Sequence, residues 1–336
     1  MYYVVHNMER TVMQAIQIEA FGNPAEVMKL VDIPDVGAPG EGEVVIALEA
    51  SPINMSDLLM ISGRYGYRPK LPSVMGTEGV GRVIAVGSGI KHLRQGDRTL
   101  VPYPAPAWAE RIKADASRLR PLPSGDVNQL AMLGINPPTA YLMLTDFVTL
   151  PSGSWVIQNS ANSGVGRALI PIAKSLGLKT VNVVRREDVV AELKAIGGDV
   201  VLVDGPDLDK RVVAETGKAP IALAVDGVGD TATTNLLGCL ADKGVHVFYS
   251  MISGKPSVVP AAQLIFRDIS MRGFWLANWF NSATPDQITR MYDRLTPLVA
   301  SGAISTPIAG TYSFAELAEA VAVASKNRGK VLFKAG

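Results

Sequence analysis

The sequence predicts an α/β protein in which a doubly wound parallel sheet is joined to a region of short strands. Between Trp155 and Tyr249, short apolar runs alternate with helical patterns, which is the order of a parallel sheet with helical crossovers. Residues 15–121 instead hold strand-like runs separated by Gly and Pro, which is typical of a small β-barrel. The run Lys330–Phe333 reads as one more strand. Because the parallel sheet already has its strands, we expect this run to return to the first region.

The clearest motif is the strand, small-residue turn and helix that begin at Trp155. Small residues let the backbone approach a phosphate, and the free N–H groups at a helix N-terminus bind an anion. We therefore expect the pyrophosphate of a dinucleotide at this turn. The spacing departs from the usual G-x-G-x-x-G, because Ala161 and Ser163 stand at the first two glycine positions before Gly166. An ordinary connection within a parallel sheet is the alternative interpretation.

Two arginines follow the second predicted strand, Thr180–Val184. At this point a fold that binds NAD usually carries an acid, which bonds the ribose hydroxyls. The guanidinium groups of Arg185 and Arg186 suit a 2′-phosphate instead. The pair therefore indicates NADPH, and a solvated strand end is the alternative.

Composition narrows the class of protein. With 336 residues, 48% of them hydrophobic, the chain is long enough for two domains and is not disordered. A net charge of +1 gives no general attraction to nucleic acid or to anionic membranes. The single cysteine, Cys239, excludes a disulfide framework and a thiolate zinc cluster. Residues 1–11 lack a signal-peptide core, so we expect a cytoplasmic protein whose fold starts near Met13.

Three further stretches carry polar or aromatic residues that suit a ligand. They are Ile53–Asp57 followed by Gly63–Tyr67, then Gly76–Gly81, and finally Arg272–Leu276. Tyr65, in a loop flanked by glycines, can donate a proton or a hydrogen bond, or it is a surface aromatic. Phe274 and Trp275 can line an apolar channel or belong to the core. Asn136, before two prolines, can present its amide to a ligand or cap a helix.

These features together resemble the zinc-free branch of the medium-chain dehydrogenases/reductases. Zinc-dependent relatives carry a Gly-His-Glu motif where this sequence has Gly76-Thr77-Glu78, so Thr77 replaces the ligand histidine. The cysteine lobe of those relatives is missing as well. The resemblance thus implies no metal, and it implies that hydrogen-bond donors stabilise the oxyanion of the reaction.

Within that branch the sequence is most similar to the NADPH-dependent 2-enoyl thioester reductases. The stretches that carry this resemblance are Gly63–Gly66, Ile135–Pro137, Val156–Gly166, Asn182–Arg185 and Arg272–Leu276. Gln158-Asn159 is the most telling pair, because quinone reductases of the branch usually differ there. Glu187 departs from the pattern, since a second arginine is usual at that position. The resemblance implies a GroES-like catalytic domain in residues 1–126, a Rossmann NADPH-binding domain in 127–304, and a return to the catalytic domain in 305–336.

The resemblance also implies the activity, which is reduction of the C=C bond of an α,β-unsaturated thioester by hydride from NADPH. Tyr65 would donate the proton or stabilise the enolate. The implied cofactor-binding residues are Asn136, Asn162, Ser163, Gly164, Val165, Gly166, Arg185, Arg186, Tyr249, Ser250, Met251, Ile252, Phe274, Trp275, Leu276 and Lys330. We expect a homodimer that acts on a small molecule. The alternatives are an NADPH:quinone or enone reductase, and a regulatory nucleotide-binding protein without turnover.

Overall fold

The computed structural model describes residues 11–326 and 328–335, and the chain divides into two compact units. The first consists of the described parts of Met1–Gly134 and Thr306–Gly336, and the second is Ile135–Ser305. Residues 127–134, which we expected in the nucleotide domain, lie in the first unit. The extension expected before Met13 falls almost wholly outside the described residues.

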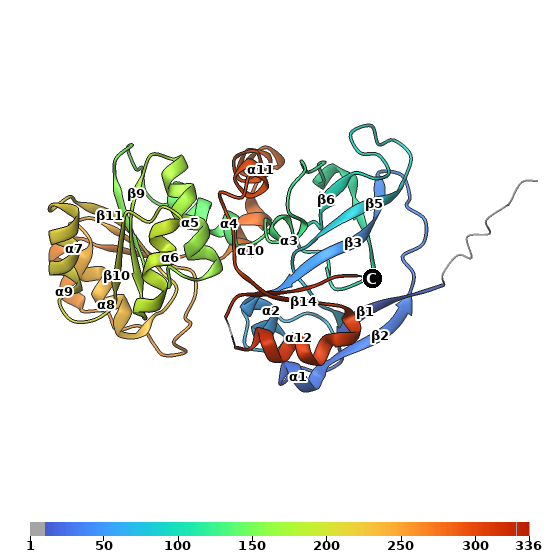
Figure 1. The fold of residues 1–336 in the computed structure, drawn as a ribbon, viewed down its shortest axis with the longest axis horizontal. Coiled ribbons are helices and arrows are strands. Elements are labelled where there is room, and N and C mark those ends of the chain that lie inside the picture. The colour runs from blue at the N-terminus through green and yellow to red at the C-terminus, as the bar shows by residue number, and fades with distance from the viewer. Residues whose placement is uncertain (1–10, 327, 336) are drawn as a thin grey trace, which may run out of the picture. The chain divides into compact units, whose positions relative to one another are not determined.

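The second unit is built on a six-stranded sheet in which all neighbouring strands are parallel (Figure 1). In spatial order its strands are β10 (Val200–Val203), β9 (Lys179–Val184), β8 (Trp155–Gln158), β11 (Ile221–Asp226), β12 (Val245–Phe248) and β13 (Ser270–Gly273). The chain runs outward from β8 to β10 and then returns to β11 on the other side of β8. The order therefore reverses between β8 and β11, which is where open α/β sheets bind their ligands.

Helices cover both faces of this sheet. They are α4 (Asn136–Thr145), α5 (Gly164–Ser175), α6 (Val190–Ala195), α7 (Leu208–Thr216), α8 (Asp230–Cys239), α9 (Ala261–Arg267), α10 (Leu276–Ser282) and α11 (Pro285–Ala300). Successive residues of a strand enter different apolar clusters: Val183 packs with α7 and α8, whereas Val184 packs with α5 and α6. Among the residues described, every helix falls short of the length and apolarity that a bilayer crossing requires.

The first unit is rich in strands. Its larger sheet contains β14 (Ile308–Tyr312), β15 (Lys330–Phe333), β3 (Glu43–Ile53), β5 (Val80–Val86), β6 (Arg98–Leu100) and β7 (Arg111–Asp115); its smaller sheet contains β2 (Met28–Pro34), β1 (Val12–Ile18) and β4 (Ser73–Val74). The described residues of this unit also form short helices, which are α1 (Pro24–Val27), α2 (Met55–Ile61), α3 (Val127–Leu130) and α12 (Leu317–Ala324). Strand β15 pairs with β3 in antiparallel register, so the expected return of the last strand to the first region is confirmed.

Three aromatic rings hold β15 in the core of the first unit. Phe333 lies between Trp108, at a centroid distance of 5.3 Å, and Phe314, at 5.6 Å, and both contacts are edge-to-face. Gly76 adopts a φ of +91°, and a Cβ there would lie 2.5 Å from the Trp108 ring. Gly76 is therefore needed both for its backbone conformation and for the space that Trp108 fills.

Candidate functional site

The turn between β8 and α5 is the first component of the candidate site. Ser160 adopts a φ of +50°, which is uncommon for a residue with a side chain. Ser163 is the N-cap of α5, and its Oγ accepts a hydrogen bond from the Gly166 N–H at 3.1 Å. Asn162, Gly164 and the buried Val165 complete the turn and the start of the helix. The other N–H groups of the first helical turn are available to an anion.

Two glycines allow unusually close packing at this turn. A Cβ on Gly166 would lie 2.6 Å from the Cα and the carbonyl oxygen of Ala161, so only glycine fits there. A Cβ on Gly164 would lie 2.9 Å from Nδ2 of Asn136. The small residues that the sequence analysis selected are therefore required by the contacts of the turn.

Asn136 is the first residue of α4, and the N-cap position before it is held by Ile135. Its Nδ2 is buried beside Gly164 and has no hydrogen-bond partner among the described residues. A buried donor without a partner is costly unless a ligand supplies an acceptor. Of the two interpretations of Asn136, this geometry favours presentation of the amide to a ligand over helix capping.

The two arginines lie just beyond the end of β9, and both are exposed. Arg186 is already paired, with 3.2 Å between its Nε and Oδ1 of Asp188. Arg185 forms no ion pair within the described part of the chain. Of the two, Arg185 is therefore the guanidinium that a phosphate can approach without displacing another anion.

The loop after β12 reaches the same turn through Tyr249. The Tyr249 hydroxyl lies 3.4 Å from Oγ of Ser163, and burial raises the pKa of Tyr249 to about 12. A Cβ on Gly227 would lie 2.5 Å from that hydroxyl, so the phenol also covers the start of the β11–α8 connection. Ser250 is half-buried, whereas Met251 and Ile252 expose their side chains.

The last predicted group leads from β13 into α10. The Phe274 N–H donates to the carbonyl of Phe248 at 2.7 Å, and the Phe274 ring packs edge-to-face on Phe147. Trp275 is the N-cap residue of α10, and Leu276 is buried. Because the carboxyl ends of parallel strands meet at one edge of a sheet, the groups that follow β8, β9, β12 and β13 share that edge.

A buried carboxylate that the sequence analysis did not select organises this edge. Asp226, at the end of β11, accepts hydrogen bonds from Asn159 Nδ2 at 2.7 Å and from Thr233 Oγ1 at 2.7 Å. The backbone N–H groups of Val228 and Gly229 add two more, at 2.8 and 3.0 Å. Burial opposes ionisation, but these bonds and the nearby imidazole of His246 hold the pKa of Asp226 well below its usual range. Asp226 is an ionised anchor of the β11–α8 turn.

Tyr65, the predicted catalytic residue, lies in the first unit in the loop after α2. Arg68 fixes this loop, because its Nε and Nη2 both donate to the Gly63 carbonyl, at 3.0 and 2.7 Å. Tyr65 is half-buried against the apolar core, whereas Tyr67 is 55% exposed. Burial and the neighbouring Tyr65, Tyr67 and Asp57 raise the pKa of Tyr103 to about 12, so these groups lie near one another.

The first unit also brings together two stretches that the sequence analysis selected separately. Thr77 Oγ1 donates to Oδ1 of the buried Asp57 at 2.7 Å, and Asn54 Nδ2 donates to Oε1 of the buried Glu78 at 2.7 Å. The Lys330 ammonium donates a hydrogen bond to Oδ1 of Asn54. Burial raises the pKa of Asp57 to about 6 and lowers the pKa of Lys330. The structure thus places Lys330, a predicted cofactor ligand, half-buried beside the buried Asp57 and Glu78 of the first unit.

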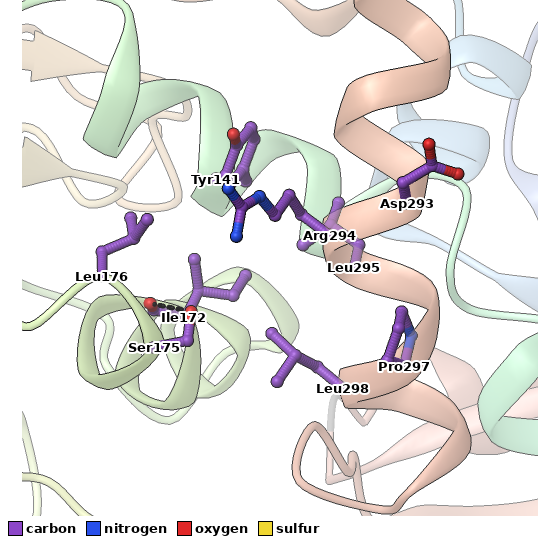
Figure 2. A pocket seen from close by; sticks show the side chains of 9 residues that line it. All are labelled: Tyr141, Ile172, Ser175, Leu176, Asp293, Arg294, Leu295, Pro297 and Leu298. Carbon is purple, nitrogen blue, oxygen red and sulfur yellow. Dashed lines mark hydrogen bonds between the residues drawn. The ribbon is translucent and has the colours of Figure 1, made fainter.

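The described residues offer no metal site, and their main pocket lies away from the candidate site. Within residues 11–326 and 328–335, no three His, Cys, Asp or Glu side chains are placed to hold a metal ion. A pocket of about 260 Å³ lies in the second unit between α4, α5 and α11. Figure 2 shows its lining, which is Tyr141, Ile172, Ser175, Leu176, Asp293, Arg294, Leu295, Pro297 and Leu298. None of the predicted site residues lines this pocket, which is therefore separate from the turn between β8 and α5.

Comparison with known families agrees with this architecture. Residues 40–156 match the alcohol dehydrogenase GroES-like domain. Residues 164–295 match the family described as zinc-binding dehydrogenase. The two matches cover most of the first unit's large sheet and most of the second unit.

Individual relatives are more specific. The mitochondrial enoyl-[acyl-carrier-protein] reductase of Rattus norvegicus is 40% identical over 298 residues, covering 85% of this chain and 78% of the relative. A putative NADPH:quinone reductase from Bacillus thuringiensis has a TM-score of 0.88 and 26% identity, and the match covers 97% of this chain and 100% of that one.

A third similar protein has been solved with ligands. This protein is Etr1p, a 2-enoyl thioester reductase of Candida tropicalis. Its complex with NADP and crotonyl-CoA has a TM-score of 0.86 and 25% identity to this chain. The match covers 97% of this chain and 100% of that chain. By its similarity to the rat enzyme above all, the chain belongs to the enoyl-[acyl-carrier-protein] reductase family, in the zinc-free branch of the medium-chain dehydrogenases/reductases, and is an oxidoreductase.

Proposed function

We propose that the protein reduces the C=C bond of a 2-enoyl thioester with NADPH. Nucleotide binding is supported by the start of α5, where the buried Nδ2 of Asn136 lies against Gly164 and has no hydrogen-bond partner among the described residues. A pyrophosphate supplies acceptor oxygens for that amide and negative charge for the helix N-terminus. The substrate class is supported by the relatives named enoyl reductases and by the Etr1p complex with crotonyl-CoA.

In the proposed reaction the chain binds and orients the nucleotide and the substrate, and it donates hydrogen bonds to the substrate. When bound, NADPH supplies the hydride that adds to the β-carbon of the substrate. Tyr65 donates its hydroxyl hydrogen to the enolate, either as a hydrogen bond to oxygen or as the proton that reaches the α-carbon. No zinc is required, and the Thr77 hydroxyl at the expected ligand position is instead bonded to Asp57.

We also propose that the protein is a homodimer formed through β13 and α9. In the described residues β13 pairs only with β12, so its other edge is open to a further strand. On α9, Ile265 and Phe266 are 70% and 82% exposed, which is costly for residues in contact with water. A two-fold axis beside β13 would pair the edge with itself and bring these side chains together. The cytoplasmic location expected from the sequence stays a prediction.

The first prediction concerns the substrate. With crotonyl-CoA, NADPH should be consumed and butyryl-CoA formed in equal amounts, while benzoquinones should give no turnover. The quinone activity is the second candidate, because the Bacillus thuringiensis neighbour with a TM-score of 0.88 carries that name. Turnover of benzoquinones alone would establish that candidate, and turnover of neither acceptor would contradict both.

The second prediction concerns the cofactor. A charge-assisted hydrogen bond contributes about 1.5–3 kcal/mol, so kcat/KM should favour NADPH over NADH by at least about tenfold. Arg185→Ala should remove most of this preference, and Arg186→Ala should remove less, because Arg186 is already paired with Asp188. Lys179→Ala, a cation removed from the opposite end of β9, is the control and should leave the ratio unchanged. Equal kcat/KM values for the two cofactors in the unmodified enzyme would refute the assignment.

The third prediction concerns Tyr65. Tyr65→Phe removes one donor from the proposed reaction, and the loss of such a donor typically lowers kcat by about 10²–10³. The KM for NADPH should barely change, since the proposed phosphate contacts involve other residues. Tyr67→Phe is the matched control, because Tyr67 lies two residues away and is mostly exposed. If Tyr67→Phe loses kcat and Tyr65→Phe keeps it, the assignment of the catalytic tyrosine is wrong.

The fourth prediction concerns assembly. Light scattering at micromolar concentration should give the mass of a dimer for the unmodified chain. The double variant Ile265→Asp/Phe266→Asp should be monomeric, because it places two charges in the proposed contact. Val213→Asp, on the exposed face of α7, should remain dimeric. A monomeric unmodified protein would exclude the proposal.

A further inference from the structure

Two amide side chains lie inside the parallel sheet of the second unit. Gln158 in β8 is 1% exposed, and Asn182, its register partner in β9, is 0% exposed. Gln158 Nε2 donates to Oδ1 of Asn182 at 2.8 Å. Asn182 Nδ2 in turn donates to Oγ1 of Thr180 at 2.9 Å and to the carbonyl of Val200 in β10 at 3.0 Å. A polar row thus crosses three strands whose buried positions are ordinarily aliphatic.

Stability alone does not account for this row. Oε1 of Gln158 is buried and accepts no hydrogen bond from the described residues. An unpaired buried acceptor destabilises a fold, and buried polar groups can often be replaced by apolar ones of similar volume without loss. The row therefore has a cost that a Val or a Met in the same place would avoid.

A second bond of the Gln158 amide indicates what the row does. Its Nε2 also donates to the carbonyl of Gly166 at 2.9 Å. Gly166 lies in the first turn of α5, where its missing side chain lets the helix approach Ala161. The row therefore ties the start of α5 to β8, β9 and β10 from inside the sheet.

We propose that Gln158 and Asn182 are positioning residues that hold the N-terminus of α5 where the pyrophosphate of NADPH binds. The inference rests on the proposed function. A helix N-terminus binds an anion well only if its N–H groups are already in place, and buried side chains supply that rigidity. The adjacent Asn159 holds the turn between β11 and α8 in a similar way, because its Oδ1 accepts a hydrogen bond from the Gly227 N–H at 2.8 Å.

The test replaces the amide by an apolar side chain of similar volume, Gln158→Met. We expect the Kd and the KM for NADPH to rise about fivefold to tenfold, because the N-terminus of α5 loses one hydrogen bond that holds it in place. The kcat should stay within about twofold of the value of the unmodified enzyme. The Tm without nucleotide should fall, because Oδ1 of the buried Asn182 loses its donor, so the change in Kd is judged against a control variant that also lowers the Tm. The readouts are direct titration of NADPH fluorescence, thermal unfolding, and initial rates.

The matched control is Ile157→Val, the neighbouring buried residue of β8, which faces the opposite side of the sheet. It should lower the Tm and leave the Kd for NADPH unchanged. An unchanged Kd for Gln158→Met, or an equal rise for Ile157→Val, would overturn the inference while the proposed function stands. If the unmodified protein binds no NADPH, both this inference and the proposed function are wrong. Should Gln158→Met fail to fold, Gln158→Met/Asn182→Val removes both amides and is judged by the same titration.

Discussion

The nucleotide-binding half of this molecule depends on one close contact, between the first turn of α5 and the end of β8. A Cβ on Gly166 would lie 2.6 Å from backbone atoms of Ala161, so the helix can start this near the sheet only with glycine there. Ser163 caps the helix and Gly164 leaves room for Asn136. The loops after β9, β12 and β13 leave the sheet at the edge where this helix begins, and Tyr249 of the β12 loop reaches Ser163 at its N-terminus.

Two buried aspartates show how their surroundings decide the charge of a carboxyl group. Burial raises the pKa of Asp57 to about 6 and outweighs the Asn54 N–H, the Thr77 hydroxyl and the Lys330 ammonium, which favour its charged form. Asp226 is also buried, yet two side-chain donors, two backbone N–H groups and His246 hold its pKa low. Desolvation acts in the same direction on both residues, and the number of donors reverses the result.

Much of the second unit could be predicted, because apolar runs and helical spacing alternate there; the strands from β8 to β12 lie where the pattern indicated. Strand β13, Ser270–Gly273, has no apolar run and is mostly exposed, so hydrophobicity could not reveal it. Helix α11 was missed although Thr284 and Gln287 form its capping box. The hydrogen bonds from Asn54 to Glu78 and from Gln158 to Asn182 depend on strand pairing, which a local pattern does not contain. The roles of Tyr65 and Arg185 stay predictions.

The position of β15 has a consequence for how the chain is made. The first unit is discontinuous in sequence: β3 pairs with β15, and Phe333 fills the space between Trp108 and Phe314. Residues 12–134 are synthesised well before β15, so the larger sheet and the core of the first unit stay incomplete while Ile135–Ser305 is made. Ile135–Ser305 is one continuous stretch and can close during translation. The second unit can then close before the first, and residues 51–53 of β3 stay without a partner strand until β15 is made, although the rest of β3 already has β5 and β7 beside it.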